Sequence, residues 1–228
     1  IADEYGLLVI EDNAQAIDAH GDDFKIGELS DAVTTSFIIQ KNLGTFGDGG
    51  AVTTNHQFLN DRIRKLRNHG SNKRDVHSFG FNSRLDDLHA GILSAKLKHI
   101  REWSDRRIEI AQKYTQCLQD CDFIDLPYVR PGYRHVFHLY VIETKDPAER
   151  NPMLEYLAKN GVDAKTHYSI PIHQQDGFPW GKPARIPEPL TNAEKNSSSC
   201  ISLPMFPELT EEEIQYTIQV VRDWPKNR

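Results

Sequence analysis

The sequence predicts an α/β protein in two parts: a larger domain of alternating strands and helices, then a smaller α+β domain. Two observations predict this. Apolar runs typical of strands alternate with helical periodicity through the first half of the chain. All 12 prolines lie at or after Pro127, whereas 10 of the 14 glycines come before it. This shift in composition places the predicted domains at residues 1–122 and 123–228.

Strands and helices alternate in the first half. Residues 1–6 read as part of a helix, with no basic start like that of a signal peptide, so we expect the chain to be a fragment of a longer one. Residues 7–10, Leu-Leu-Val-Ile, have the pattern of a buried parallel strand. Further strands are predicted at 32–39 and 51–54. Helical spacing predicts a helix within 55–68 and a long one over 85–103, continuing to 118.

The second half has its own strand and helix signals. Residues 136–142 form a predicted strand. Asn151 before Pro152 is typical of a helix start, and Gly161 of its C-terminal cap. Thr210 and Glu213 have the spacing of a capping box that opens a final helix.

Composition excludes several classes of protein. The 228 residues carry 27 Lys plus Arg against 33 Asp plus Glu, a net charge of −6, which argues against a nucleic-acid-binding surface. No apolar run is long enough to span a bilayer, so no membrane protein is expected. Three cysteines do not make a disulfide framework and favour a cytoplasmic location.

Two candidate reactive residues follow predicted strands. Asp12 ends the first strand and Lys41 follows the second, and ligands of open α/β sheets bind beyond these carboxyl ends. A lysine there can trap a carbonyl, and a carboxylate can pair with a cationic ring nitrogen. Pyridoxal phosphate (PLP) needs both. The simpler interpretations, a solvated lysine and an aspartate that caps the next helix, stay open.

A glycine-rich run spans residues 44–50. It could cradle a phosphate, but it lacks the Gly-Lys-Ser/Thr ending of a nucleotide-binding loop, so nucleotide hydrolysis is disfavoured. A tight turn with positive φ at Gly47, Gly49 and Gly50 is the expectation. Cys117 with Cys121, and His135 with His138, have spacings that disfavour a metal site.

Several sequence blocks together carry a family resemblance. They are Val-Ile-Glu-Asp-Asn-Ala-Gln-Ala at 9–16, Ser-Phe at 36–37 with Lys41, Leu-Gly-Thr-Phe-Gly-Asp-Gly-Gly-Ala at 43–51, Arg-Asn-His-Gly at 67–70, Gly-Phe-Asn-Ser-Arg-Leu-Asp at 80–86 with 90–97, and Ile-Ser-Leu-Pro-Met-Phe-Pro-Glu-Leu-Thr at 201–210. In this order they resemble the DegT/DnrJ/EryC1/StrS family of sugar aminotransferases. The resemblance implies an N-terminally truncated type I aminotransferase (aspartate aminotransferase-like) large domain and a small C-terminal α+β domain.

The resemblance also implies a role for individual residues. Lys41 matches the catalytic lysine that binds PLP covalently and moves a proton. Cofactor-binding roles fall to Asp12 at the ring nitrogen, Gln15 at the ring oxygen or face, Ser36 at the phosphate, and Asn82 at the phosphate of a neighbouring subunit. The Asn82 role implies a homodimer with shared active sites.

Two further residues are candidates for substrate binding. Arg84 would clamp the donor carboxylate or the phosphate of a sugar nucleotide, since a guanidinium fork suits either. A structural ion pair is the alternative. His167 and His173 flank a segment that lies near the active-site mouth in the family, and His173 is the residue we assign to the sugar pocket.

The expected activity is PLP-dependent transfer of an amino group from an amino acid, glutamate, to a nucleotide-linked keto-sugar of polysaccharide or antibiotic biosynthesis. Lys41 favours transamination, because family members that remove a hydroxyl carry histidine there. Aminotransfer to a cyclitol ketone and a non-catalytic dimerising remnant or regulatory chain remain alternatives. A missing upstream segment would leave the sheet with an unpaired edge and an exposed apolar face.

Overall fold

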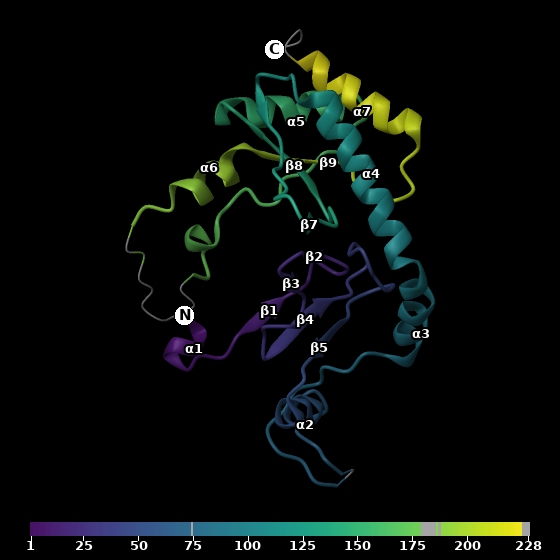
Figure 1. The fold of residues 1–228 in the computed structure, drawn as a ribbon, viewed down its shortest axis with the longest axis vertical. Helices are drawn as coiled ribbons and strands as arrows, with labels where there is room; N and C mark the ends of the chain where they lie inside the picture. The colour runs from purple at the N-terminus through teal and green to yellow at the C-terminus, as the bar shows by residue number, and fades with distance from the viewer. Residues whose placement is uncertain (74, 179–185, 187, 225–228) are drawn as a thin grey trace. The chain divides into compact units, whose positions relative to one another are not determined.

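The computed structural model describes residues 1–73, 75–178, 186 and 188–224 (Figure 1). It divides into two compact units, Ile1–Arg106 with Val129–His138, and Arg107–Tyr128 with Leu139–Arg228. Helix α4 (Ile100–Leu118) carries the chain from the first unit into the second. The predicted domain boundary after residue 122 remains a prediction.

The first unit is built on a three-stranded sheet in the order β1-β4-β5. Strand β1 (Ile10–Asp12) runs parallel to β4 (Ala32–Ser36), and β5 (Gly50–Thr53) pairs antiparallel with β4. The central strand β4 carries Val33, Thr34 and Thr35, β-branched residues that favour a pleated backbone. Ala32 and Val33 are buried, so β4 contributes to the hydrophobic core of the first unit.

The predicted burial of residues 7–10 is wrong. A short helix α1 (Ala2–Tyr5) ends at Gly6 in the left-handed conformation, and only Ile10 of the apolar run belongs to β1. Leu8 is 75% exposed and Ile10 71% exposed. Within the described residues no strand pairs with the outer edge of β1, so these side chains have nothing to pack against. The parallel direction and the exposed apolar edge agree with expectation.

A small second sheet in the first unit was not predicted. Strands β2 (His20–Gly21) and β3 (Phe24–Lys25) form a hairpin, and β7 (Tyr133–Arg134) pairs antiparallel with β2. Ion pairs from Arg134 to Asp18, at 2.8 Å, and to Asp105, at 2.7 Å, hold β7 in place. Strands of two residues carry no readable alternation, so the sequence gives no sign of this pairing.

The helices of the first unit follow the predicted periodicity. After α1 they are α2 (Gln57–Leu66) and α3 (Asp87–Lys96). The predicted long helix is interrupted by a tighter turn at Leu97–His99 before α4 begins. No helix of the described part of the chain has the length and apolar content needed to cross a membrane.

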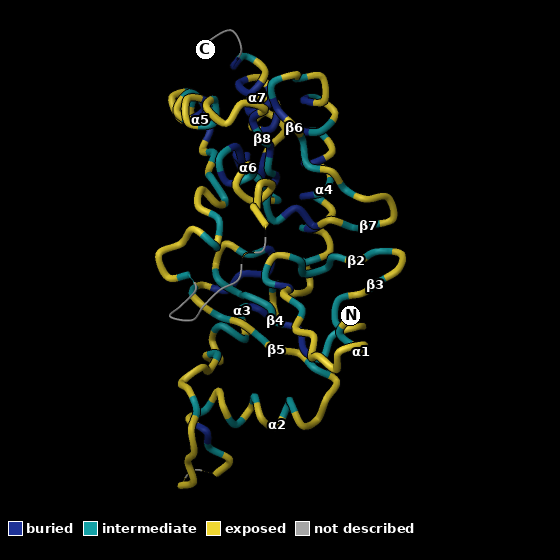
Figure 2. Tube along the Cα trace, turned by 90° about the vertical axis from the view of Figure 1, so that its left-hand side faces the viewer, coloured by how far each residue is buried: buried dark blue, intermediate teal, exposed yellow. Residues whose placement is uncertain are grey.

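The second unit packs helices on an antiparallel sheet in the order β6-β8-β9. The strands are β6 (Ile124–Asp125), β8 (Tyr140–Thr144) and β9 (Cys200–Leu203), and the helices besides α4 are α5 (Arg150–Lys159), α6 (Thr191–Ser199) and α7 (Glu211–Asp223), with short turns of 3-10 helix at Pro147–Glu149 and Ile172–Gln174. The fully buried side chains include Tyr114, Leu118, Tyr140, Ile142, Met153, Leu157, Ile201, Ile214 and Val221. They form the core of this unit (Figure 2).

Local signals in the second unit are partly confirmed. Thr210 and Glu213 form the predicted capping box, and Gly161 adopts the predicted left-handed conformation after α5. The predicted strand at 136–142 begins only at Tyr140, because Phe137 has φ +42°, outside the strand region. Asn151 lies inside α5 instead of capping it.

Candidate active site

Two predicted site residues end neighbouring parallel strands. Asp12 is the last residue of β1, and Ser36 is the last residue of β4. Asp12 lies opposite Thr34 in the strand register, so Ser36 follows two residues further along β4. The fold therefore brings a carboxylate and a hydroxyl to one edge of the sheet, where ligands of open α/β sheets bind.

The Asp12 carboxylate is exposed and only partly used. One oxygen, Oδ1, accepts a hydrogen bond of 2.9 Å from the backbone N–H of Ala14 in the turn after β1. The next element of the described chain is strand β2, so the alternative that Asp12 caps a following helix is wrong. No cation pairs with Asp12 among the described residues. Asn13 is buried next to it, and its Nδ2 donates to Thr35 Oγ1 at 3.1 Å. The predicted cofactor residue Gln15 is exposed in the same turn, and its amide makes no hydrogen bond within the described chain.

Lys41 lies in a tight loop between β4 and β5. Its own N–H donates to the carbonyl of Ile38 at 2.9 Å, and the N–H of Thr45 donates to the carbonyl of Phe37 at 2.8 Å. The Phe37 N–H donates to the Gly49 carbonyl at 2.7 Å, so the loop closes back on the start of β5. The Lys41 amine has no hydrogen bond or ion pair with the residues that the structure describes. The backbone is therefore held while the amine stays available.

The glycines of this loop are required for close packing, not for positive φ. The prediction of positive φ at Gly47, Gly49 and Gly50 is wrong, since none of the three has it. A Cβ on Gly49 would lie 3.1 Å from Leu85 Cδ1. At Gly44 it would lie 2.4 Å from the Ile39 carbonyl oxygen, a separation that no side chain tolerates.

Two side chains that sequence reasoning missed tie the Lys41 loop to the rest of the first unit. Lys96 Nζ in α3 donates to the carbonyl of Gly44. Asn42, directly after Lys41, is buried and bonded to Val136 and His138. Because Asn42 directly follows a candidate catalytic lysine, the sequence could have indicated that Asn42 has a role at the site. Nothing near it in the sequence indicated its distant partners.

Asn82 and Arg84 lie on an extended segment beside the end of α2. Asn82 forms a backbone bridge with Asn68, and the N–H of Ser83 donates to the carbonyl of Arg67 at 2.9 Å. Arg84 Nη1 lies 3.5 Å from Asn68 Oδ1, and no ion pair of Arg84 occurs among the described residues. No hydrogen bond or ion pair in this part of the chain joins Asn82 or Arg84 to Asp12, Ser36 or Lys41.

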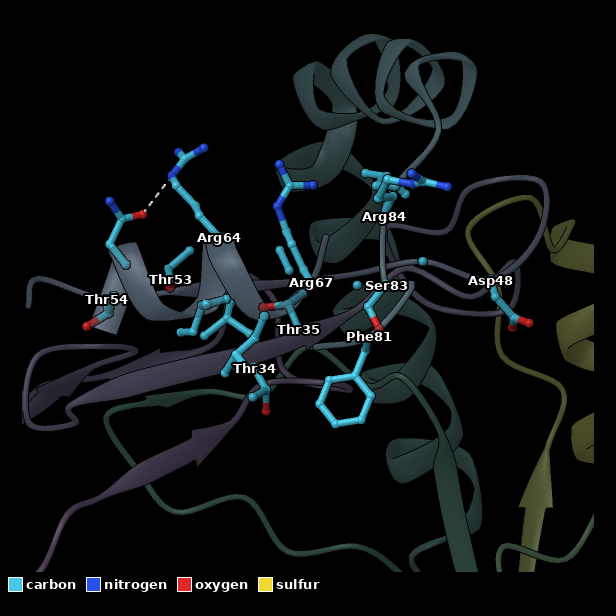
Figure 3. A pocket seen from close by; sticks show the side chains of 18 residues that line it. Thr34, Thr35, Asp48, Thr53, Thr54, Arg64, Arg67, Phe81, Ser83 and Arg84 are labelled. Carbon is cyan, nitrogen blue, oxygen red and sulfur yellow. Dashed lines mark hydrogen bonds between the residues drawn. The ribbon is translucent and has the colours of Figure 1, made fainter. Parts of the chain in front are cut away.

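A cavity of about 1000 Å³ lies against the same sheet, between β4, β5, α2 and residues 81–85 (Figure 3). Figure 3 shows Arg64, Arg67 and Arg84 along one side of it, with Arg64 Nε bonded to Asn60 Oδ1 at 2.9 Å. Arg84 is the one predicted site residue that lines the cavity; Asp12, Gln15, Ser36 and Lys41 do not. The cavity is therefore separate from the Lys41 edge, the name we give to the carboxyl ends of β1 and β4 with the loop that carries Lys41.

His173 belongs to the second unit. Its Nε2 lies 3.0 Å from Glu194 Oε1, an ion pair when the imidazole is protonated. Together with Tyr168, Ile170 and Phe178 it lines a mainly apolar hollow of about 550 Å³. His167 Nδ1 lies 2.8 Å from Ser202 Oγ. An imidazole beside apolar and aromatic side chains suits a ligand with both hydroxyls and flat apolar faces.

Comparison with known proteins decides the family. The model of the DegT/DnrJ/EryC1/StrS aminotransferase family matches residues 1–222. The chain belongs to this family. This match confirms the family that the sequence blocks between residues 9 and 210 led us to expect.

The relatives bear mostly transaminase names. A "pleiotropic regulatory protein" of Geobacillus stearothermophilus is 39% identical over 98% of this chain and 60% of that protein. The dTDP-3-amino-3,4,6-trideoxy-alpha-D-glucose transaminase of Streptomyces venezuelae is 37% identical over 98% of this chain and 58% of that protein. The chain thus spans about 60% of the length of the curated relatives it matches.

A solved structure confirms the predicted fold class. The crystal structure of S. venezuelae DesV superposes with a TM-score of 0.89 at 37% identity, covering 98% of this chain and 59% of DesV. The chain therefore has the aminotransferase fold of its family. This family is one of PLP-dependent sugar aminotransferases.

The residues at the Lys41 edge fit PLP. The cofactor needs an amine for its aldehyde, an acid for its ring nitrogen and donors for its phosphate. In the part of the chain that the structure describes, the Lys41 amine has no partner and one Asp12 carboxylate oxygen has no hydrogen-bond donor, and Ser36 offers a hydroxyl. The family's cofactor and this set of side chains agree.

Proposed function

We propose that this chain carries the PLP site of an aminotransferase that moves an amino group from an amino acid, glutamate, to a nucleotide-linked keto-sugar. One observation carries the proposal. The Lys41 amine is without a partner in the described chain, in a loop whose backbone is fixed at the same sheet edge as Asp12 and Ser36. The names of relatives that act on dTDP- and UDP-linked sugars support the substrate class.

Bound PLP would supply an electron sink for the carbanion formed at the substrate α-carbon. Lys41 would hold the cofactor through Nζ. Once the amino group of the substrate has displaced it, the same amine would move a proton between the substrate α-carbon and C4′. Asp12 would keep the ring nitrogen protonated through its charge. Ser36 would bind the phosphate, and Gln15 would contact the ring oxygen or face.

Three further roles complete the proposal. Asn82 would reach the cofactor phosphate of a second subunit, so we infer a homodimer with shared active sites. Arg84 would bind the donor carboxylate or a phosphate of the nucleotide, which its lack of an ion pair within the described residues supports. His173 would line the sugar pocket. We place the protein in the cytoplasm, consistent with its three free cysteines.

A second candidate function is a regulatory chain without catalysis. The regulatory name of one relative favours it. Lys41, Asp12 and Ser36 together weigh against it, because a chain that needs no cofactor has no use for this combination. Transfer to a cyclitol ketone differs from the main proposal only in the acceptor.

The absorption spectrum of the purified chain with PLP tests the proposal. Addition of PLP should produce a visible band that glutamate bleaches, and Lys41→Ala should show neither change. Lys73→Ala, an exposed lysine in another loop, is the matched control. Identical spectra for all three proteins would favour the regulatory function. Return of the bleached band on addition of a keto-sugar nucleotide, and not on addition of a cyclitol ketone, would identify the acceptor.

A further inference from the structure

A buried polar side chain directly follows Lys41. Asn42 is 8% exposed, and both ends of its amide are used within the first unit. Nδ2 donates to the carbonyl oxygen of Val136 at 3.2 Å, and Oδ1 lies 3.0 Å from His138 Nδ1. Asn42 therefore ties the lysine loop to a segment 94 to 96 residues further along the chain.

The direction of each bond follows from the chemistry of the groups. A backbone carbonyl only accepts, so the amide nitrogen of Asn42 faces Val136 and the amide oxygen faces His138. That oxygen also only accepts, so His138 carries a proton on Nδ1 and donates it. Position 42 thus requires both a donor and an acceptor, and position 138 requires a donor.

The segment that receives Asn42 is itself fixed. Val136 and Phe137 are buried, and the N–H of Phe137 donates to His135 Nδ1 at 3.0 Å. A few residues earlier, β7 pairs with β2 and Arg134 bridges two aspartates. Because these contacts hold the segment in place, its carbonyl and imidazole are a rigid attachment point for the loop.

The loop is held on both sides of the lysine while its amine is left unbonded within the described chain. Before Asn42, the Lys41 N–H bonds to Ile38; after it, Lys96 bonds to the carbonyl of Gly44. A reactive group works best when its backbone is fixed and its reacting atom is not engaged elsewhere. Asn42 supplies the long-range part of that constraint.

Resting on the proposed role of Lys41, we propose that Asn42 and His138 form a positioning pair that holds the Lys41 loop at the edge where β1 and β4 end. Neither residue touches the reacting atoms; both act through the loop backbone. Without the pair the loop populates other conformations, and the fraction of molecules with the lysine in place falls.

Amide hydrogen exchange of the cofactor-free chain tests the pair directly. Asn42→Ala should accelerate exchange within residues 38–46 by about tenfold or more, because it removes the amide that bonds the buried Val136 carbonyl and the His138 imidazole. Asn72→Ala, the same change at an exposed asparagine, is the control and should leave this loop unchanged. Equal exchange in both variants would overturn the proposal.

Substitution of His138 gives a second test that does not depend on how well Asn42→Ala folds. The side-chain nitrogen of asparagine occupies nearly the place of a histidine Nδ1, so His138→Asn preserves the donor and His138→Leu removes it. We expect His138→Leu to loosen the loop as Asn42→Ala does, and His138→Asn to retain most of the protection. If the two His138 variants behave alike, the pair is not what positions the loop.

Kinetics of the loaded protein separate positioning from a merely structural role. Loss of the pair should lower kcat about tenfold while KM for the amino donor stays within about twofold. A lower melting temperature with kcat per folded molecule unchanged would contradict positioning. Because hydrogen exchange is measured without cofactor, a failure of the proposed function would leave the exchange result standing, so the two failures are distinguishable.

Discussion

Asp12 lies opposite Thr34 in the parallel register of β1 and β4, and this pairing sets the site. A shift of one residue would turn every side chain of β1 to the other face of the sheet. In the observed register Asp12 is the last residue of β1, and Ser36 ends β4 two residues after Thr34, the residue opposite Asp12. The loop that follows Ser36 carries Lys41. The carboxylate, the hydroxyl and the amine of the proposed site thus come from the ends of two neighbouring strands and from the loop that follows one of them.

Replacing Asp12 by Asn should impair the chemistry without unfolding the site. The amide oxygen of Asn can still accept the hydrogen bond from Ala14, so the turn survives, but the negative charge that would hold a proton on the ring nitrogen is gone. We expect kcat/KM to fall about 100-fold, the scale seen when one preorganised electrostatic partner is removed. Steady-state kinetics with Asp3→Asn, an exposed aspartate of α1, as the control measure this; equal rates would refute the role of Asp12.

Two glycine substitutions should have opposite effects on stability. In Gly44→Ala the new Cβ meets the carbonyl oxygen of Ile39 at 2.4 Å, so the Lys41 loop must distort, and the free energy of unfolding should fall by about 1–3 kcal/mol. In Gly91→Ala the Cβ meets nothing within 4 Å and replaces a weak helix former in α3, so the free energy should rise by up to about 1 kcal/mol. Urea unfolding of both variants checks the signs, and two changes of the same sign would contradict the loop geometry.

Stability should fall between pH 10 and pH 12 because of one buried tyrosine. Burial raises the pKa of Tyr114 from 10.0 to about 12, and its hydroxyl donates to the carbonyl of Pro204 at 2.9 Å. The folded state therefore holds the phenol proton more tightly than the unfolded state. This stabilisation is complete below pH 10 and is lost as the pH rises to about 12, a change of about 3 kcal/mol.

The measurement compares Tyr114→Phe with the original chain at several pH values. The advantage of the original chain should be constant below pH 10 and shrink across the window up to pH 12. Tyr5→Phe, at an exposed tyrosine, should follow the original chain throughout. A constant difference for Tyr114→Phe up to pH 12 would mean that the buried phenol does not titrate as its environment requires.

Local sequence signals predicted local structure well. The Thr210–Glu213 capping box and the left-handed Gly161 depend on chemistry within four residues, and both are confirmed. The β-branched residues of β4 also identified the central strand. Each of these features is fixed by neighbours in sequence, so one sequence suffices to read it.

Features that depend on distant partners could not be read from the sequence. Whether Leu8 and Ile10 are buried depends on which strands flank β1, and their apolar character alone does not say. The bond from Asn42 to His138 joins residues 96 positions apart and leaves no periodic trace. The role of the glycines after Lys41 was misjudged for the same reason, since Gly49 makes room for Leu85, a residue on another element.

The most direct test of the central claim is borohydride reduction of the PLP-treated chain followed by peptide mapping. Reduction converts the bond between PLP and a lysine amine into a stable adduct whose position mass spectrometry identifies. The account predicts one dominant adduct, on the peptide that contains Lys41, and its loss when glutamate is added before reduction. Adducts spread over exposed lysines, with Lys41 no more modified than the others and no effect of glutamate, would contradict it.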